Sequence, residues 1–290
     1  MLVIVRTPGA AFRDAISTHP DRDHIDVSRT RVEHAAFCAA LEDAGLTLLR
    51  LPEEPDLPDA TFVSDSILAL APLLRNRSPV VVVARPAVAS RRPEVDSVLR
   101  AALPHLPADT QVVRVEDPGT LEGGDVIIFG DRIAIGLSGR TNELGARSLA
   151  DAARSLGYRP FLCPVTDRLH LATAVTAVTA DMLIGTAAGF ASLDTAGPDA
   201  APRPEIRRLL LPDDELLGAN VLALGGHLFL DSRNPTAVRL LHETGMPVHE
   251  LELDEFALAD GGPTCLVNVL PGRRGTDEPQ PTATFDRLQA

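Results

Sequence analysis

Apolar and polar residues alternate along this chain in a recurring order. In the clearest stretch, Val126 to Phe129 and Ile133 to Leu137 have the pattern of two short strands joined by a tight glycine turn. A helical pattern follows, with Thr141 or Asn142 as its N-cap, and Tyr158 to Val165 supplies a third strand. This stretch therefore predicts a unit of strand, strand, helix and strand.

The same order of elements recurs and gives five units in all. First strands of three further units are expected at Ser66 to Leu70, His170 to Thr179 and Asn220 to Leu224. The fifth unit is complete only if the C-terminal strand, Cys265 to Leu270, joins the N-terminal strand, Met1 to Arg6. Five units that close through the two termini predict an α/β ring, in which neighbouring units bury each other's flanks.

The chain is expected to form one catalytic domain over residues 1–270. The tail at 271–290 has the composition of a disordered end. No apolar run approaches the ~20 residues of a membrane span, and the apolar start of the chain is too short for a signal peptide. We therefore expect a cytoplasmic protein that contacts no membrane, present as a monomer or a homodimer.

Composition excludes several kinds of chemistry. The formal net charge of −13 argues against nucleic-acid binding and suits a cationic ligand, although an acidic surface needs no ligand. All 27 basic residues are arginine, which excludes Schiff-base lysines and a P-loop lysine. The three cysteines, Cys38, Cys163 and Cys265, lack metal-ligand spacing and suggest a reducing compartment. No metal or organic cofactor is therefore expected.

Distinctive side chains stand at equivalent places in these units, near the start of each first strand. They are Asp65, Glu122, Asp125, His170 and Cys265. Strand ends on a common axis would bring them together as a nucleophile, a general acid/base and anchors for a cation.

Each candidate also has a packing explanation. A cysteine in a strand is usually a core residue, and a histidine between apolar residues, such as His170, is as often core as catalyst. Asp125 follows two glycines, where an aspartate commonly accepts hydrogen bonds from loop amides. The Gly261-Gly262-Pro263 sequence before Cys265 favours a defined turn at this cysteine. For Cys38 and Cys163, a place in the hydrophobic core remains the expected explanation.

Taken together, the motifs resemble those of the dimethylarginine dimethylaminohydrolases, of the guanidine-modifying (pentein) superfamily. The resemblance covers about Ile25 to Leu270 and rests on LPDATFVSD, RPAVASRR, LEGGDV, GLSGRTN, LHL and TC, in the family's order. It implies a five-bladed α/β propeller of ββαβ units closed by the N- and C-terminal segments, which agrees with the five units counted above.

The resemblance also implies catalytic roles. Cys265 would be the nucleophile and His170 the general acid/base. Glu122 would orient His170 and the substrate's guanidinium, and Asp65 would hold the guanidinium nitrogens.

Further residues would bind the rest of the substrate. Asp59 stands where the family contacts the amino end, and Arg91 and Arg140 correspond to the arginines that bind the α-carboxylate, for which a bidentate fork is apt. Two positions depart from related patterns: Ser64 replaces the family's usual Glu, and Ala172 stands where arginine deiminases have Asp.

The implied activity is hydrolysis of N-omega-methylated arginine, a small cationic guanidino amino acid, to citrulline and methylamine or dimethylamine. A covalent Cys-thiouronium intermediate and no cofactor would be involved. The alternatives are a hydrolase of free arginine or another guanidino compound, an amidinotransferase, and a non-catalytic arginine-binding protein.

Overall fold

The computed structural model describes residues 1–166, 168–195, 206–215 and 217–271, and within them the strands form five three-stranded sheets. The strands are β1 (Leu2–Arg6), β2 (Thr47–Leu51), β3 (Ile67–Leu70), β4 (Val80–Val83), β5 (Gln111–Arg114), β6 (Val126–Phe129), β7 (Arg132–Leu137), β8 (Arg159–Pro164), β9 (Val175–Thr179), β10 (Met182–Thr186), β11 (Arg207–Leu211), β12 (Leu222–Leu224), β13 (His227–Asp231), β14 (Val248–Leu251) and β15 (Asn268–Leu270). The helices are α1 (Val27–Asp43), α2 (Arg92–Ala102), α3 (Glu143–Ser155), α4 (Ala187–Asp194), α5 (Pro235–His242) and α6 (Asp254–Leu258).

Each sheet has the same topology. In the unit first identified from the sequence, β6 is antiparallel to β7, and β7 is parallel to β8 with α3 between them. Asn142 is the N-cap of α3 and accepts a hydrogen bond from the backbone N–H of Gly145 at 3.0 Å. The predicted ββαβ units are therefore confirmed.

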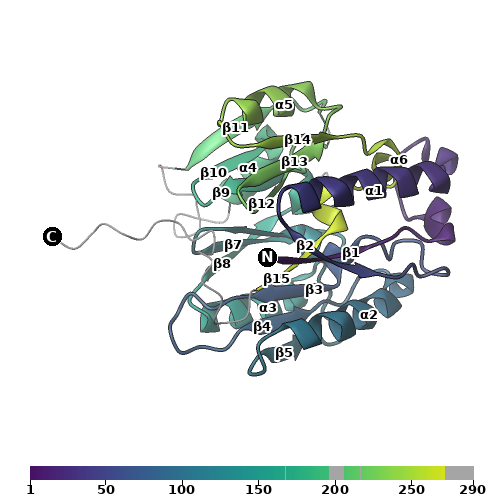
Figure 1. The fold of residues 1–290 in the computed structure, drawn as a ribbon. Coiled ribbons are helices and arrows are strands. Elements are labelled where there is room, and N and C mark those ends of the chain that lie inside the picture. The colour runs from purple at the N-terminus through teal and green to yellow at the C-terminus, as the bar shows by residue number, and fades with distance from the viewer. Residues whose placement is uncertain (167, 196–205, 216, 272–290) are drawn as a thin grey trace.

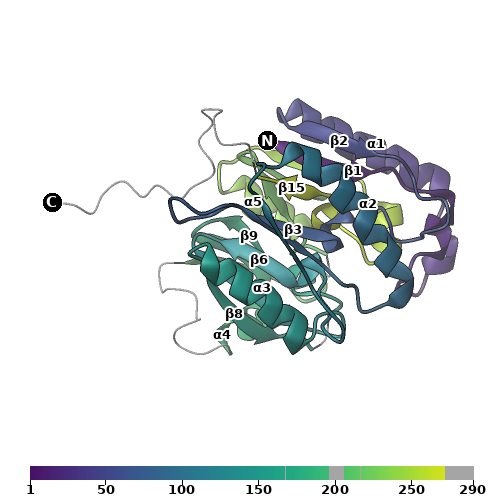
Figure 2. The same cartoon turned by 90° about the horizontal axis from the view of Figure 1, so that it is seen from below.

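The two ends of the described chain share one sheet, as predicted. β15 pairs antiparallel with β1, which places Leu2 opposite Leu270, and β1 pairs parallel with β2. Figure 1 shows β15, β3 and β12 toward the middle of the molecule, with α1, α2 and α5 at its periphery. Figure 2, seen from below, shows α2 and α3 in front of the strands and α1 along one edge.

Successive units are joined side by side in cyclic order. At each of the five junctions a polar side chain bonds to the backbone of the next unit, at distances of 2.6 to 3.0 Å. The pairs are Asp65 with Gly124, Asp125 with Leu171, Thr176 with Ala219, Asn220 with Thr264, and Asn268 with Ile67. The starts of the first strands therefore lie near one another in the middle of the molecule.

Two predicted strand boundaries are wrong. Cys265 lies in a short 3-10 helix, Pro263–Leu266, and His170 immediately precedes another, Leu171–Thr173. Similar turns, Val63–Asp65 and Gly123–Asp125, precede β3 and β6. A single apolar 3-10 turn is too short to interrupt a strand-like hydrophobic pattern. The pattern therefore predicted one continuous strand where the structure has a turn followed by a strand.

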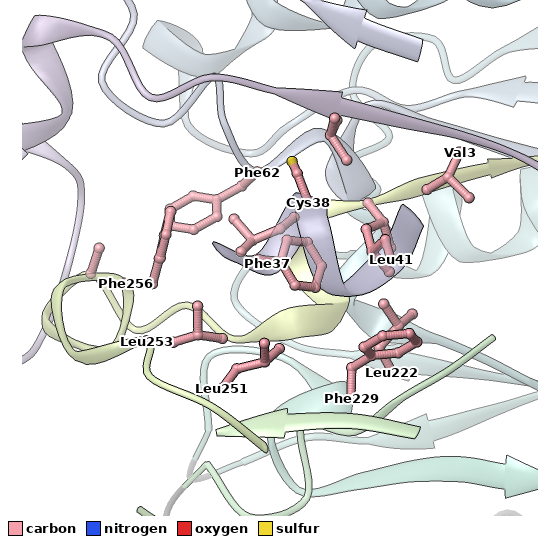
Figure 3. Close-up of a cluster of buried hydrophobic side chains, with 14 of the residues drawn as sticks. Val3, Phe37, Cys38, Leu41, Phe62, Leu222, Phe229, Leu251, Leu253 and Phe256 are labelled. Carbon is pink, nitrogen blue, oxygen red and sulfur yellow. The ribbon is translucent and has the colours of Figure 1, made fainter. Parts of the chain in front are cut away.

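The hydrophobic core fills the spaces between neighbouring units. In the cluster drawn in Figure 3, Phe37 and Leu41 on α1 pack against Val3, Phe229 and surrounding residues. Phe37 and Leu41 are four positions apart and so share the inner face of the helix. Within the described residues, none of the helices combines the length and apolarity needed to cross a bilayer. The predicted disordered tail, apart from Pro271, lies outside the described residues.

Candidate active site

The 3-10 turns in the middle of the molecule bring the predicted site residues to one small cavity. It is lined by Ile16, Asp59, Phe62, Asp65, Arg91, Arg140, Leu169, His170, Ala259, Asp260, Gly261 and Cys265. Glu122 is fully buried and contacts His170, Arg91 and Arg140. Six of the seven predicted site residues thus line the cavity and the seventh bonds to three of them.

The Gly123-Gly124 pair is required by close packing at this site. A Cβ atom on Gly124 would lie 2.6 Å from Nδ1 of His170, and one on Gly123 would lie 2.0 Å from the backbone oxygen of Ser64. Both distances are shorter than any non-bonded contact that packing allows. The two glycines therefore let the imidazole and the neighbouring turn approach the backbone beside Glu122.

His170 and Glu122 form a buried hydrogen-bonded pair. Nε2 of His170 lies 3.0 Å from Oε2 of Glu122, and Oε1 of Glu122 accepts the backbone N–H of Ala87 at 3.2 Å. Burial alone lowers the pKa of His170, but the charge of Asp65 and the hydrogen bond to Glu122 outweigh it and raise the pKa above its ordinary value. His170 is therefore suited to carry a proton and to donate it.

Asp65 is held in place on both of its oxygens. Oδ1 accepts the backbone N–H of Gly124 at 2.8 Å, and Oδ2 accepts Nη1 of Arg91 at 3.0 Å. Burial raises the pKa of Asp65, but the positive charges of His170 and Arg91 outweigh it, so the pKa lies below its ordinary value. Asp65 therefore stays ionised in the buried site.

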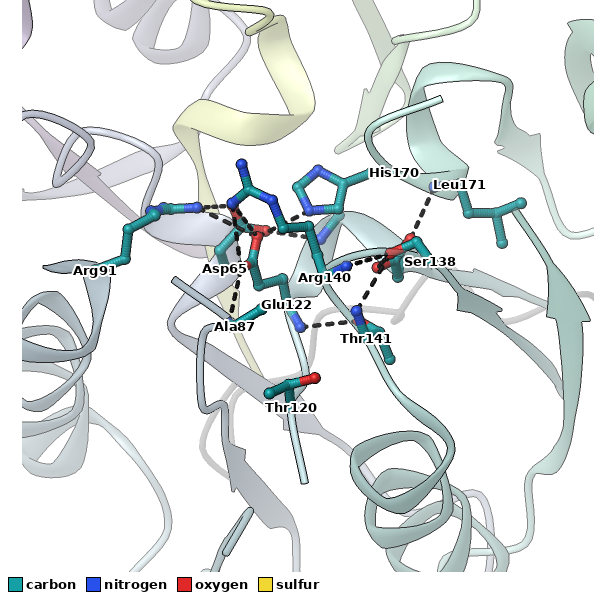
Figure 4. Close-up of polar contacts among 12 residues, drawn as sticks. Asp65, Ala87, Arg91, Thr120, Glu122, Ser138, Arg140, Thr141, His170 and Leu171 are labelled. Atoms are coloured by element: carbon teal, nitrogen blue, oxygen red, sulfur yellow. Dashed lines mark hydrogen bonds and ion pairs between the residues drawn. The ribbon is translucent and has the colours of Figure 1, made fainter. Parts of the chain in front are cut away.

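Two guanidinium groups of the chain already contact these carboxylates, as Figure 4 shows. Besides Asp65, Nη1 of Arg91 lies 3.4 Å from Oε2 of Glu122. Nη1 of Arg140 lies 3.2 Å and 3.4 Å from the two oxygens of Glu122. The acidic side of the cavity thus binds guanidinium groups by charge-assisted hydrogen bonds, while the expected contact of both arginines with an α-carboxylate stays a prediction.

The cavity is nearly full in this state. Its volume is about 20 Å³, which is enough for roughly one water molecule. An arginine side chain therefore does not fit unless at least one of the lining side chains moves. Asp59, at the same cavity, accepts the backbone N–H of Ile16 at 3.1 Å, and burial raises its pKa against the opposing charges of Arg91 and Arg140.

Cys265 is fixed by the turn that precedes β15. Its N–H donates to the backbone oxygen of Gly262 at 3.0 Å, and Nδ2 of Asn220 lies 3.7 Å from its Sγ. Burial and the charge of Asp65 raise the pKa of the Cys265 thiol, so the sulfur rests as a neutral thiol. Cys38 and Cys163 are buried in the core, as predicted, and burial raises the pKa of their thiols to about 11 and about 12.

Two functional neighbours were missed in the sequence. Asn220 accepts hydrogen bonds from the N–H and Oγ1 of Thr264 at 3.0 and 2.9 Å, and so braces the turn that carries Cys265. The repeat contained a signal for it, because Asn220 opens the first strand of the fourth predicted unit. Glu94, which bonds to Arg91, gave no signal, because a glutamate in the first turn of a helix is common. Asp125 accepts the N–H of Leu171, which confirms its expected role as an acceptor of loop amides.

Asp65, Glu122 and His170 are also the described residues whose geometry could hold a metal ion, with ligand atoms within 4.8 Å of one another. Each of the two carboxylates already accepts at least one hydrogen bond from a guanidinium N–H group. A divalent cation would have to compete with these resident positive charges. The arrangement is therefore better suited to a planar cation with several N–H donors.

No model of a protein family matches the chain. Two known proteins that are similar to it over most of its length carry the same name. The chain is 34% identical to an N(G),N(G)-dimethylarginine dimethylaminohydrolase of Streptomyces coelicolor, over 91% of this chain and 94% of that protein. It is 27% identical to the enzyme of the same name from Pseudomonas aeruginosa, over 91% and 97%.

Solved structures show the same fold. A dimethylarginine dimethylaminohydrolase variant, solved as an adduct with S-methyl-L-thiocitrulline, superposes with a TM-score of 0.79 at 25% identity, covering 92% of this chain and 98% of that one. The N-terminal domain of the arginine dihydrolase ArgZ from cyanobacteria, bound to its product, has a TM-score of 0.75 at 15% identity, over 94% and 98%. At that identity the second likeness shows the fold alone.

Proposed function

Because the chain belongs to the dimethylarginine dimethylaminohydrolase family, we propose that Cys265, His170 and Glu122 catalyse hydrolysis of an N-omega-methylated arginine. The products are citrulline and methylamine or dimethylamine. The observation that carries the proposal is a cavity where a thiol and an imidazole face carboxylates that already bind guanidinium groups.

Substrate binding replaces one resident guanidinium. The substrate's guanidinium takes the place of Arg140 on Glu122 and also bonds to Asp65, where two carboxylates fix its plane. Arg140 then turns toward the α-carboxylate, and Asp59 receives the amino end. Arg91 contacts the same α-carboxylate through the Nη2 hydrogen that Glu94 does not accept, while its Nη1 stays on Asp65 and Glu122. These binding roles are supported by the position of Asp59, Asp65, Arg91 and Arg140 at the cavity.

The first half of the reaction forms a covalent intermediate. The positive charge of the bound substrate offsets the charge of Asp65, which lowers the pKa of Cys265, and the thiol proton passes to solvent. The thiolate attacks the central guanidinium carbon. As the C–N bond to the methylated nitrogen breaks, protonated His170 donates its proton to the departing amine. A thiouronium on Cys265 remains.

The second half restores the enzyme. Neutral His170 takes a proton from water, and the water oxygen attacks the thiouronium carbon. The C–S bond then breaks with its electron pair going to sulfur, the proton of the added hydroxyl group passes to that sulfur as the ureido C=O forms, and citrulline leaves. Glu122 keeps the imidazole oriented through both halves by its hydrogen bond to Nε2.

We also propose the wider setting of the protein. Residues 1–270 would act as one catalytic domain, and the protein would be cytoplasmic, as a monomer or a homodimer, without nucleic-acid or membrane partners. The three unpaired cysteines, Cys38, Cys163 and Cys265, support a reducing compartment.

A product assay tests the proposed activity. The protein would be incubated separately with N-methylarginine, asymmetric dimethylarginine, arginine and methylguanidine, and the products identified by mass spectrometry. Citrulline and the matching alkylamine are expected from the methylated arginines. Citrulline from arginine alone, or transfer of the amidino group to an added amine, would overturn the proposed substrate or reaction.

A further inference from the structure

Glu94 lies behind the active site and contacts one of its arginines. It is in the first turn of α2, its side chain is 3% exposed, and it is not among the cavity-lining residues. Its Oε2 accepts Nε of Arg91 at 3.2 Å and Nη2 at 3.1 Å. Glu94 therefore holds the side edge of the Arg91 guanidinium, the edge formed by Nε and Nη2.

This contact decides which part of Arg91 reaches the catalytic carboxylates. With its side edge held, Arg91 offers only Nη1 to Asp65 and Glu122, at 3.0 and 3.4 Å. A free arginine would instead tend to form a two-bond fork with a carboxylate. Such a fork would occupy the hydrogen-bonding positions that a substrate's guanidinium needs.

Glu94 also changes the charge that a substrate meets. The positive charge of Arg91 is shared among Glu94, Asp65 and Glu122, all of them buried. Without the charge of Glu94, Arg91 would neutralise Asp65 and Glu122 more completely. The site would then attract a cationic guanidinium less strongly, while a neutral ureido group would be little affected.

We propose that Glu94 is a positioning residue that sets the preference of this site for cationic guanidino ligands over the neutral ureido product. It does so by anchoring Arg91 away from the guanidinium-binding positions of Asp65 and Glu122. The inference rests on the proposed function for the identity of the site, but its test measures binding and does not require turnover.

The titration of Glu94 gives this preference a pH dependence. Burial raises the pKa of Glu94 to about 7, Arg91 opposes the shift, and Asp59 and Asp65 add to it. Arg6 on β1 is a further charge that interacts with Glu94. Glu94 ionises as the pH rises through about 7, so the preference for the cation should strengthen between pH 6 and 8.

The test compares two ligands of nearly equal shape. Affinities for N-methylarginine and for citrulline would be measured by calorimetry at pH 8, in the Cys265→Ala protein with and without Glu94→Gln. We expect the affinity for N-methylarginine to fall about tenfold, as for loss of a unit charge about 12 Å away at an effective dielectric constant near 20. The affinity for citrulline should stay within about twofold, because a neutral group does not respond to that charge.

The matched control is Asp96→Asn, which removes the same charge from the same helix. Asp96 is 56% exposed and pairs with Arg114, so it should change neither affinity. Equal losses for both ligands in Glu94→Gln, or no loss for the cation, would overturn the proposal.

A second measurement needs no change at position 94. In the Cys265→Ala protein the ratio of cation to citrulline affinity should rise from pH 6 to pH 8. A ratio that stays flat, or a protein that binds no N-methylarginine, also overturns the proposal. If the wild-type protein binds the cation with this preference but hydrolyses no methylated arginine, the proposed function fails and the role of Glu94 stands.

Discussion

Removal of the Arg140 side chain should have opposite effects on two classes of guanidine. In the structure, Nη1 of Arg140 lies 3.2 and 3.4 Å from the oxygens of Glu122, where a substrate's guanidinium is proposed to bind. Arg140→Ala removes this competitor for every substrate. It removes a partner of the α-carboxylate only for amino-acid substrates, so methylguanidine loses no contact.

The expected magnitudes follow from these contacts. A charge-assisted hydrogen bond contributes roughly 1.5–3 kcal/mol, so KM for N-methylarginine should rise about 10- to 150-fold relative to KM for methylguanidine, which shares any gain from removal of the competitor. The attraction between Arg140 and Glu122 is about 4 kcal/mol at an effective dielectric constant of 20 and a separation of ~4 Å. Most of this is recovered when the displaced guanidinium is hydrated, because the Arg140 side chain is 12% exposed at the cavity edge. For methylguanidine we therefore expect an unchanged KM, or one lowered by up to about tenfold.

Steady-state kinetics with both substrates would check this. Arg147→Ala is the matched control, since Arg147 lies on α3, is 64% exposed and pairs with Glu143; neither KM should change. A similar rise in KM for both substrates with Arg140→Ala would show that Arg140 supports the fold of the site and does not bind the substrate's α-carboxylate. That result would refute the displacement argument.

Three further predictions concern the nucleophile, the acid/base and stability. Cys265→Ser should abolish turnover and covalent labelling detected by mass spectrometry, whereas Cys38→Ser should alter only thermal stability; an active Cys265→Ser protein would contradict the thiol mechanism. His170→Gln should lower kcat by about 10²–10⁴-fold, since both proton transfers are lost; a near wild-type rate would mean that His170 is a core residue. Burial raises the pKa of Glu33 from 4.5 to about 7, so the folded protein holds a proton that the unfolded chain releases, and stability should fall as pH rises from about 4.5 to 7. Glu33→Gln should reduce that fall in denaturant titrations, and an unchanged pH dependence would show that the Glu33 carboxyl does not ionise in this window.

The repeating pattern was sufficient to predict the fold because each unit has a strong local signal. Alternating apolar residues, glycine turns and a helix cap such as Asn142 define the elements independently in each unit. Joining the two terminal strands followed from the incomplete fifth unit, and the pairing of Leu2 with Leu270 confirms it. The meeting of distant residues could then be predicted from their equivalent positions in the repeat.

The orientation of the charged side chains was not predictable in the same way. Whether Arg140 contacts Glu122 or extends toward a ligand depends on the balance of buried charges in three dimensions, which leaves no periodic signal. The contact between Glu94 and Arg91 joins residues three positions apart in sequence. Its effect on the site depends on the contact of Arg91 with the distant residue Asp65, which the sequence does not show. Sequence patterns specify which groups meet, and electrostatics decides how they pair.

Charge balance also gives a physical account of Ser64, which stands where the family usually has Glu. Among the described residues, Ser64 Oγ is buried and has no hydrogen-bond partner. The contacting groups around the site are Asp65, Glu94 and Glu122 on the acidic side, and Arg91, Arg140 and His170, whose pKa is raised, on the basic side. When Arg140 leaves Glu122, the site loses one positive charge, which a single substrate guanidinium replaces. A carboxylate at position 64 would add a further buried negative charge, beyond the one that the departing Arg140 leaves for the substrate to pair with.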